Sequence, residues 1–104
     1  MSNKESNVVS DDQVVLHIVC SRWDEIKRDV RPHSQVVGLL LDNTKPIAVE
    51  GKTLILLVPS LFYKDNLEWP QRRRIVEEII RRSLGAAYAI RCVITSSVGL
   101  VVQS

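Results

Sequence analysis

The segment Thr53–Val58 (TLILLV) constrains the fold more than any other part of this 104-residue chain. It lies between Gly51 and Pro59, and every residue from Leu54 to Val58 is apolar. A strand that is exposed on one face alternates apolar with polar residues, whereas a strand that is apolar on both faces belongs inside a sheet. The segment therefore predicts the central strand of a β-sheet, which Pro59 ends.

Two further strands are predicted, one before and one after the central strand. In residues 46–50, Ile47 and Val49 are expected on one face, and the tight connection around Gly51 predicts a β-hairpin. From Ala87 to Ile94, the side chains of Tyr88, Ile90, Cys92 and Ile94 alternate with those between them, and this β-rich composition is typical of a strand. We therefore expect a three-stranded sheet.

A long first helix is predicted at the start of the chain. Ser10, followed by two aspartates, is suited to cap it, and Pro32 ends it because proline disfavours helical geometry in the residue before it. Its apolar stripe consists of Val14, Val15, Ile18, Val19, Trp23, Ile26 and Val30. We expect Trp23 to lie in the core, since it faces this stripe.

Three more helices are predicted from capping signals and helical spacing. Ser34 is suited to cap a short helix over residues 36–41, and Ser60 a short helix that runs to Leu67. The last helix begins at Pro70, because proline fits the first helical turn, and Gly85 is placed for a left-handed cap at its end. The apolar stripe of this last helix is Ile75, Val76, Ile79, Ile80 and Leu84.

Together these elements predict one α+β domain over residues 10–94, with a three-stranded sheet and helices packed on one of its faces. The predicted order is helix, short helix, strand, strand, helix, helix, strand. Residues 1–9 are polar and resemble a flexible linker or a cloning remnant. Residues 95–104 are too apolar for a free tail, so we expect this segment to pack on the core or to add an edge strand; its apolar residues are Val98, Leu100, Val101 and Val102.

Charge, hydropathy and cysteine usage exclude several classes of protein. With 14 Lys plus Arg against 12 Asp plus Glu, the net charge of +2 gives no strong field that would attract DNA or membranes. The apolar runs are far shorter than the roughly 20 residues that cross a bilayer. Cys20 and Cys92 form no C-x-x-C motif, which favours two buried thiols in a reducing cytosol over a disulfide or a zinc site. We therefore expect a soluble, cytoplasmic protein.

No sequence pattern carries catalytic or cofactor chemistry. The phosphate-binding patterns G-x-x-x-x-G-K-[ST] and G-x-G-x-x-G do not occur, nor does the nucleophile elbow G-x-S-x-G. His17 and His33 lack the neighbours of a metal site, and His17 is expected on a helix surface. We therefore expect a non-enzyme that holds no nucleotide, metal or other cofactor.

One cluster of arginines stands out on and beside the last predicted helix. It consists of Trp69, Arg72, Arg73, Arg74, Arg81 and Arg82. Glu77 and Glu78 stand four positions from four of these arginines, at the spacing of surface ion pairs. Three interpretations stay open: a solvated, ion-paired surface, a protein contact surface, since Trp and Arg are enriched at hot spots, and a nucleic-acid surface.

The order of the predicted elements resembles the type II KH arrangement. A KH domain that binds RNA carries a G-x-x-G loop between two of its helices, where this chain has Glu68, Trp69, Pro70 and Gln71. That departure argues against ordinary KH nucleic-acid binding.

The residues themselves resemble the C-terminal domain of the gamma/tau clamp-loader subunit of bacterial DNA polymerase III, which is related to the N-terminal domain of the initiator DnaA. The matching positions are Trp23-x-x-Ile26, the apolar helix Val36–Leu41, Pro46-Ile47, Val49-x-Gly51-x-x-Leu54, Ser60-x-Phe62-x-Lys64 and Leu84-Gly85. The pattern is one of core positions, so it carries over no binding residue individually.

The resemblance implies a non-catalytic tether in DNA replication. In that family, the C-terminal region of tau holds the catalytic subunit of the replicative polymerase and the replicative helicase, while the ATP-binding domains lie elsewhere in the parent protein. We therefore expect a docking domain whose contacts include Trp69, Arg72 and Arg73. One alternative is a single-stranded nucleic-acid-binding domain that uses the arginines of the last helix. Another is a homo-oligomerisation module built on the apolar C-terminal tail.

Overall fold

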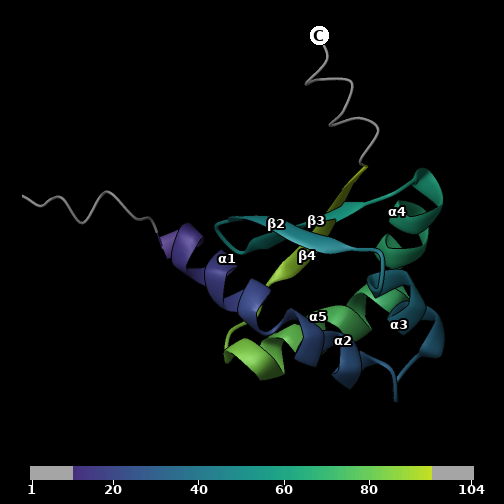
Figure 1. Cartoon of the computed structure of the whole chain (residues 1–104), viewed down its shortest axis with the longest axis horizontal. Coiled ribbons are helices and arrows are strands. Elements are labelled where there is room, and N and C mark those ends of the chain that lie inside the picture. The colour runs from purple at the N-terminus through teal and green to yellow at the C-terminus, as the bar shows by residue number, and fades with distance from the viewer. Residues whose placement is uncertain (1–10, 95–104) are drawn as a thin grey trace, which may run out of the picture.

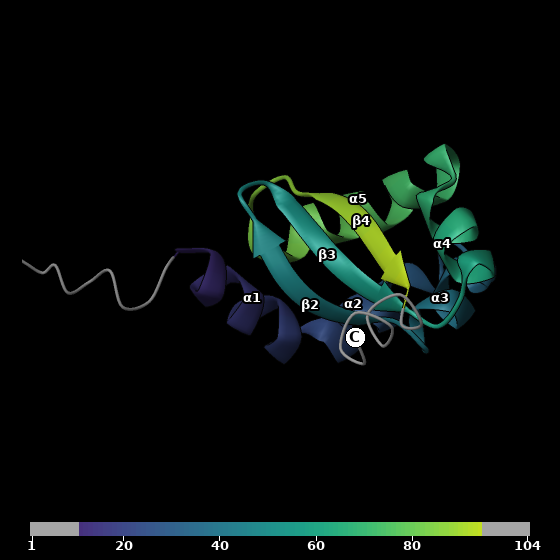
Figure 2. The ribbon, with the colours of Figure 1, turned by 90° about the horizontal axis from the view of Figure 1, so that it is seen from above.

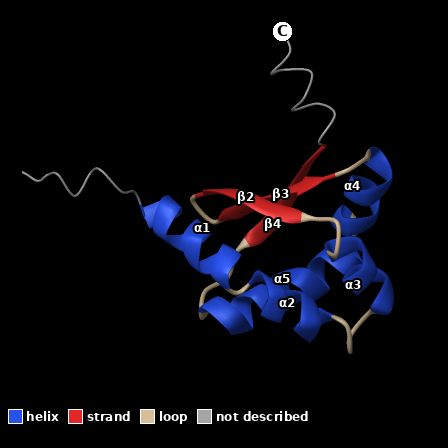
Figure 3. Cartoon of the chain, viewed as in Figure 1, coloured by secondary structure: helices blue, strands red, loops and turns tan. Residues whose placement is uncertain are grey.

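Within residues 11–94, which the computed structural model describes, the fold is α+β and combines a three-stranded mixed sheet with five helices (Figure 1, Figure 3). The helices are α1 (Asp11–Ser21), α2 (Trp23–Val30), α3 (Gln35–Leu41), α4 (Leu61–Glu68) and α5 (Pro70–Leu84). The strands are β2 (Lys45–Glu50), β3 (Thr53–Val58) and β4 (Ala89–Ile94).

β3 is the central strand, as its apolar sequence predicts. The sheet order is β2-β3-β4, with β2 antiparallel and β4 parallel to β3. Gly51 closes the β2–β3 hairpin with φ of 63°, a left-handed conformation that glycine adopts without strain. β4 joins β3 only after α4 and α5, because a parallel strand needs a long crossover connection (Figure 2).

The core lies between one face of the sheet and helices α2, α3 and α5, which Figure 1 places on the same side of the strands. Alternate residues of β3, namely Leu54, Leu56 and Val58, are almost fully buried in it. Trp23 of α2 is 7% exposed, and its indole N–H donates a hydrogen bond to the carbonyl of Thr44 at 3.0 Å. The predicted core position of Trp23 is confirmed.

The ends of α3 and α5 follow the predicted signals. The N–H of Val37 donates to Oγ of Ser34 at 3.2 Å, and Pro70 occupies the first turn of α5. Gly85 ends α5 in the left-handed conformation, with φ of 76°. Ser60 stands at the N-cap of α4 as predicted, but its side chain makes no capping hydrogen bond.

The prediction of one long first helix is wrong, because the chain divides into α1 and α2 at Arg22. α1 packs beside β2, whereas α2 packs on α5, and one straight helix could not follow both partners. The guanidinium of Arg22 donates to the carbonyl of Ser83, close to the end of α5, which anchors the break.

A bulge in β2 breaks the predicted alternation of Ile47 and Val49. The register with β3 shifts between Pro46 and Ala48, and this leaves Ile47 40% exposed while Val49 is 6% exposed. The predicted cap at Ser10, the linker 1–9 and the tail or edge strand 95–104 lie outside the described residues. Among residues 11–94, the helices are too short or too polar for any of them to span a membrane.

Candidate functional site

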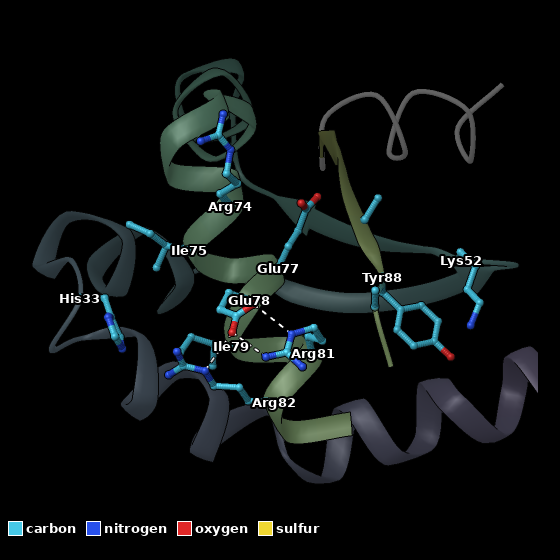
Figure 4. Close-up of a pocket in the computed structure, with 12 residues that line it drawn as sticks. His33, Lys52, Arg74, Ile75, Glu77, Glu78, Ile79, Arg81, Arg82 and Tyr88 are labelled. Atoms are coloured by element: carbon cyan, nitrogen blue, oxygen red, sulfur yellow. Dashed lines mark hydrogen bonds and ion pairs between the residues drawn. The ribbon is translucent and has the colours of Figure 1, made fainter. Parts of the chain in front are cut away.

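The contact residues predicted from the sequence lie on α5 or directly before it, but on two different surfaces. Trp69 directly precedes α5, and Arg72 lies in its first turn, in contact with α4. Arg74, Arg81 and Arg82 line a hollow on the outward side of α5 (Figure 4). The sequence does not distinguish these two surfaces, and they differ in chemistry.

The first surface, which we call the junction surface, is the outward side of α4 and the start of α5. It consists of Leu61, Phe62, Asp65, Asn66, Trp69 and Arg72. Phe62, Asn66 and Trp69 follow each other at helical spacing, while Leu67 on the opposite side of α4 is fully buried. Leu61, Phe62 and Trp69 are 57%, 65% and 57% exposed. Large apolar side chains exposed next to one another are typical of an interaction surface.

Trp69 is exposed because α4 and α5 do not form one continuous helix. The ring of Pro70 disfavours helical geometry in the preceding residue, and Trp69 is extended, with ψ of 128°. α4 therefore ends at Glu68, and α5 leaves the corner in a new direction (Figure 1). Trp69 lies at that corner and points away from the core.

Polar contacts fix the side chains of the junction surface. Nδ2 of Asn66 donates to the carbonyl of Phe62 at 2.8 Å, and Oδ1 of Asn66 accepts a hydrogen bond from Nη1 of Arg72. The ring of Phe62 meets that of Tyr63 edge-on, with centroids 5.9 Å apart. An open hollow of about 420 Å³ is lined by Asp65, Asn66, Trp69 and Arg72.

Acidic side chains of α5 neutralise several of its arginines. Oε2 of Glu78 lies 2.7 Å from Arg81 and 3.0 Å from Arg82. The hydrogen bond from Arg81, opposed by desolvation and helped by Arg82, lowers the pKa of Glu78 to about 2. Arg73 lies 3.6 Å from Glu77. The predicted pairs of Arg73 with Glu77 and of Arg82 with Glu78 are confirmed, whereas Arg81 pairs with Glu78 in place of Glu77.

The second surface, which we call the α5 hollow, lies between α5, the start of β4 and the loop before α3 (Figure 4). Its volume is about 660 Å³. Its cationic side chains are Lys52, Arg74, Arg81 and Arg82, and the acidic side chains of Glu77 and Glu78 also line it. Nζ of Lys52 lies 5.1 Å from the centroid of the Tyr88 ring. The predicted pair of Arg74 with Glu78 is not formed, and Arg74 has no ion pair within residues 11–94.

Both edges of the sheet are covered. At β4, Oε2 of Glu77 accepts a hydrogen bond from the N–H of Ile90 at 2.9 Å, and Oε2 of Glu68 accepts one from the N–H of Cys92 at 2.8 Å. Lys64 donates to the carbonyl of Cys92 at 2.8 Å. Helix α1 flanks the other edge, at β2. A partner strand would have to displace these groups before it could pair with the sheet.

The cysteines and histidines lie on different elements and do not come together in one site. Cys92 is 1% exposed, and burial, together with the charge of Glu68, raises the pKa of its thiol to about 12. The prediction that both thiols are buried is wrong for Cys20, which is exposed because Val19 beside it faces the core. His17 is exposed on α1, as predicted. Across residues 11–94, no three His, Cys, Asp or Glu side chains lie close enough together to hold a metal ion.

Besides Asp65 and Asn66, sequence reasoning missed the two apolar residues that α4 contributes to the junction surface, Leu61 and Phe62. Both belong to the apolar stretch that predicts α4, and that stretch by itself does not tell which side chains face the core. Helical spacing could have predicted the exposure of Phe62, because Phe62 lies on the far side of the helix once Leu67 is assigned to the core.

Sequence comparisons do not place the chain in a family, because no protein-family model matches it and no curated protein matches it significantly. Its function must therefore be inferred from its own surfaces.

Proposed function

We propose that this chain is a non-catalytic docking domain of the bacterial replisome. It tethers the clamp loader, as part of a gamma/tau-like subunit of DNA polymerase III, to the replicative polymerase or the replicative helicase in the cytoplasm. The junction surface makes the contact, and the chemistry of DNA synthesis belongs to the partners.

The exposure of three large apolar side chains on one side of α4 carries the proposal. Leu61, Phe62 and Trp69 are each more than half exposed. Such a side chain contributes about 1.5–3 kcal/mol when a partner buries it, and Trp is among the residues most enriched at binding hot spots. Arg72 adds a cationic group beside Trp69. Because the Arg72 side chain is already hydrogen-bonded to Asn66, it loses little conformational freedom when a partner binds.

The arrangement of the elements supports the resemblance on which the proposal also depends. Two antiparallel strands, two helices and a parallel third strand follow each other as in the type II KH arrangement, although three helices, α1, α2 and α3, precede the first strand where that arrangement has one. Trp23 and Ile26, which carry part of the resemblance, are buried, and Gly85 ends α5. The connection between α4 and α5 contains Trp69 and Pro70 in place of the glycines that a KH loop needs to approach a nucleic-acid backbone.

The electrostatics of α5 favour a protein partner over nucleic acid. Arg73, Arg81 and Arg82 are ion-paired within the helix, so much of their charge is already offset. Nucleic-acid affinity comes mainly from cations that replace the counterions of phosphates. Arg74, which lacks such a partner among the described residues, is the observation that favours the rival function, single-stranded nucleic-acid binding.

Capture of purified replication proteins by the immobilised chain tests the proposal. The chain is offered the catalytic subunit of a bacterial replicative polymerase and, separately, the replicative helicase. We expect one of them to bind, and the double variant Phe62→Ala/Trp69→Ala to weaken binding about a hundredfold. The matched control is Leu39→Ala, a side chain that is 68% exposed but lies on α3, and it should bind like the unchanged chain. The proposal is wrong if neither protein binds.

A titration with a labelled single-stranded oligonucleotide at rising salt tests the rival function. If the domain docks proteins, the oligonucleotide should not bind it tightly at physiological salt. Binding that weakens steeply with salt and is lost in Arg74→Gln, while Arg73→Gln retains it, would instead support a nucleic-acid domain.

A further inference from the structure

Small side chains keep the α5 hollow open. Ile75 and Ile79 form its apolar wall on α5, and Ala87 and Ala89 line it at and just before β4. Alanine carries only a methyl group, so these two positions leave space that a larger side chain would fill. The resulting volume of about 660 Å³ lies within the range of roughly 300–1,000 Å³ that is typical of ligand sites. The hollow therefore has room for an apolar side chain of a partner molecule.

The excess positive charge of the chain is concentrated around this hollow. Four cationic and two acidic side chains line it, whereas the whole chain has 14 Lys plus Arg and 12 Asp plus Glu. The lining residues therefore carry the entire net charge of +2, and the rest of the chain is balanced. A concave surface with an excess of one sign of charge attracts ligands of the opposite sign.

Two of the four cations are offset by a carboxylate, and two are not. Arg81 and Arg82 both pair with Glu78, and they lie in the last turn of α5, where they also offset the negative end of the helix dipole. Arg74 and Lys52 form no ion pair with another residue of the range 11–94. These two cations therefore provide the charge that an anionic ligand could use.

Glu77 lies between Arg74 and Lys52 in the view of Figure 4, but its carboxylate is already engaged. Its Oε2 accepts a hydrogen bond from the N–H of Ile90 at 2.9 Å and lies 3.6 Å from Nε of Arg73. Its repulsion of a second anion is therefore partly offset. The two free cations lie at separate ends of the hollow in the same view, so they suit a ligand with two separated negative charges.

The occupant that fits these features is an acidic peptide with an apolar side chain. A carboxylate can accept two parallel hydrogen bonds from the guanidinium of Arg74, and a second carboxylate can pair with the ammonium of Lys52. An apolar side chain between the two carboxylates would lie against the walls of the hollow. Because exposed residues such as Arg74 and Ala89 border the hollow, it suits an extended protein segment better than an enclosed small molecule.

Single-stranded nucleic acid fits the hollow less well, because its bases stack on aromatic rings while its phosphates bind cations. Tyr88 is the only Tyr, Phe or Trp among the described residues that line the hollow. Nζ of Lys52 lies over its ring, 5.1 Å from the centroid, so one face of the ring is already occupied.

We propose that the α5 hollow binds an acidic peptide segment of a partner protein. Carboxylates of the peptide pair with Arg74 and Lys52, and an apolar side chain between them packs against Ile79 and Ala89. The site is separate from the junction surface, which lies on α4 and the start of α5. The inference therefore does not depend on the proposed function.

Fluorescence anisotropy of a synthetic peptide tests the proposal. The peptide carries a fluorophore and has two leucines flanked on each side by two aspartates. We expect it to bind the full chain, and Arg74→Gln to weaken binding about tenfold and Lys52→Gln about threefold, since an ammonium makes fewer directed contacts than a guanidinium. Ala89→Leu should also weaken binding, because it fills the hollow without changing the charge.

Matched controls separate a specific site from a general effect of charge. Arg28 is exposed on α2 and does not line the hollow, so Arg28→Gln should bind the peptide like the unchanged chain. So should Phe62→Ala/Trp69→Ala, which alters only the junction surface. Absence of binding would overturn the proposal, as would equal weakening by Arg28→Gln or equal binding of a peptide with asparagine in place of aspartate. Tighter binding of a single-stranded oligonucleotide of the same charge, lost in Arg74→Gln, would overturn it in favour of a nucleic-acid site.

Discussion

The side chain of Glu68 gives the most quantitative test of how the sheet is closed. Its Oε2 accepts hydrogen bonds from the N–H of Cys92 at 2.8 Å and from Nζ of Lys64 at 3.0 Å. Replacing Glu68 by Gln keeps an acceptor of the same size but removes the charge. Replacing it by Ala also leaves the N–H of Cys92 without its partner. The two variants therefore separate the contribution of the charge from that of the hydrogen bond.

The expected loss of stability follows from the strength and the exposure of these contacts. Hydrogen bonds to a charged group contribute about 1.5–3 kcal/mol, and exposed ion pairs about 0.5 kcal/mol. The side chains of Lys64 and Glu68 are 31% and 28% exposed, so solvent screens part of the interaction. We expect Glu68→Gln to lower the free energy of unfolding by about 1 kcal/mol and Glu68→Ala by about 2 kcal/mol.

Urea unfolding followed by circular dichroism measures this difference, with Glu25→Gln as the control. Glu25 is exposed on α2, and its side chain makes no hydrogen bond or ion pair with another residue in the described part of the chain, so its replacement should change stability by less than about 0.5 kcal/mol. A Glu68→Ala variant as stable as the control would refute the view that Glu68 closes the sheet edge.

The pH dependence of the same measurement has a definite sign. Burial alone would raise the pKa of Glu68, but the N–H of Cys92 and the ammonium of Lys64 outweigh it and lower the pKa below the ordinary value of 4.5. The contribution of Glu68 to stability is therefore complete above pH 4.5 and is lost as the pH falls through the lowered pKa. The gap in stability between the unchanged chain and Glu68→Gln should be full at neutral pH and narrow in acid.

Three other predictions follow from single residues. Gly85→Ala should cost about 1 kcal/mol in urea unfolding, because φ of 76° strains any residue with a side chain, and Ala at a right-handed helical position such as Ser83 should cost less. Trp23→Ala should cost about 3–5 kcal/mol and Trp69→Ala less than about 0.5 kcal/mol, since only Trp23 is buried; equal losses would contradict the core assignment. A thiol reagent should modify Cys20 in the native protein and Cys92 only after unfolding, because Cys92 is buried and burial raises its pKa to about 12; rapid native labelling of two thiols would contradict this.

Local signals in the sequence were sufficient to predict most of the elements. Gly51, Pro70 and Gly85 each act through the backbone conformation of one or two residues, and such effects do not depend on the rest of the fold. The apolar run of β3 likewise predicts a central strand, whichever parts of the chain supply the two strands beside it. The break at Arg22 could not be predicted in this way, because it depends on α1 and α2 packing against different partners.

The candidate site was predicted only in part, for a related reason. Charge spacing on α5 predicts ion pairs because both partners lie on one helix, and it therefore succeeds for Arg73 and Arg82. The same spacing also suggests Glu77 as a partner of Arg81. Glu77 instead accepts a hydrogen bond from β4, and the sequence of α5 alone does not show that β4 packs beside it. Phe62 was missed because its exposure depends on which side of α4 the core occupies.

Closure of the sheet edge and presentation of the junction surface are linked through α4. Lys64 and Glu68 on one side of this helix bind the backbone of β4, and Phe62 projects from the other side. The contacts to β4 therefore fix the rotation of α4 and so the direction in which the exposed apolar residues point. Loosening them should also reduce capture of a partner, because the partner must then reorder the helix before it binds. Glu68→Ala should weaken capture less than Phe62→Ala/Trp69→Ala, since it perturbs the orientation of the surface and leaves its apolar side chains in place.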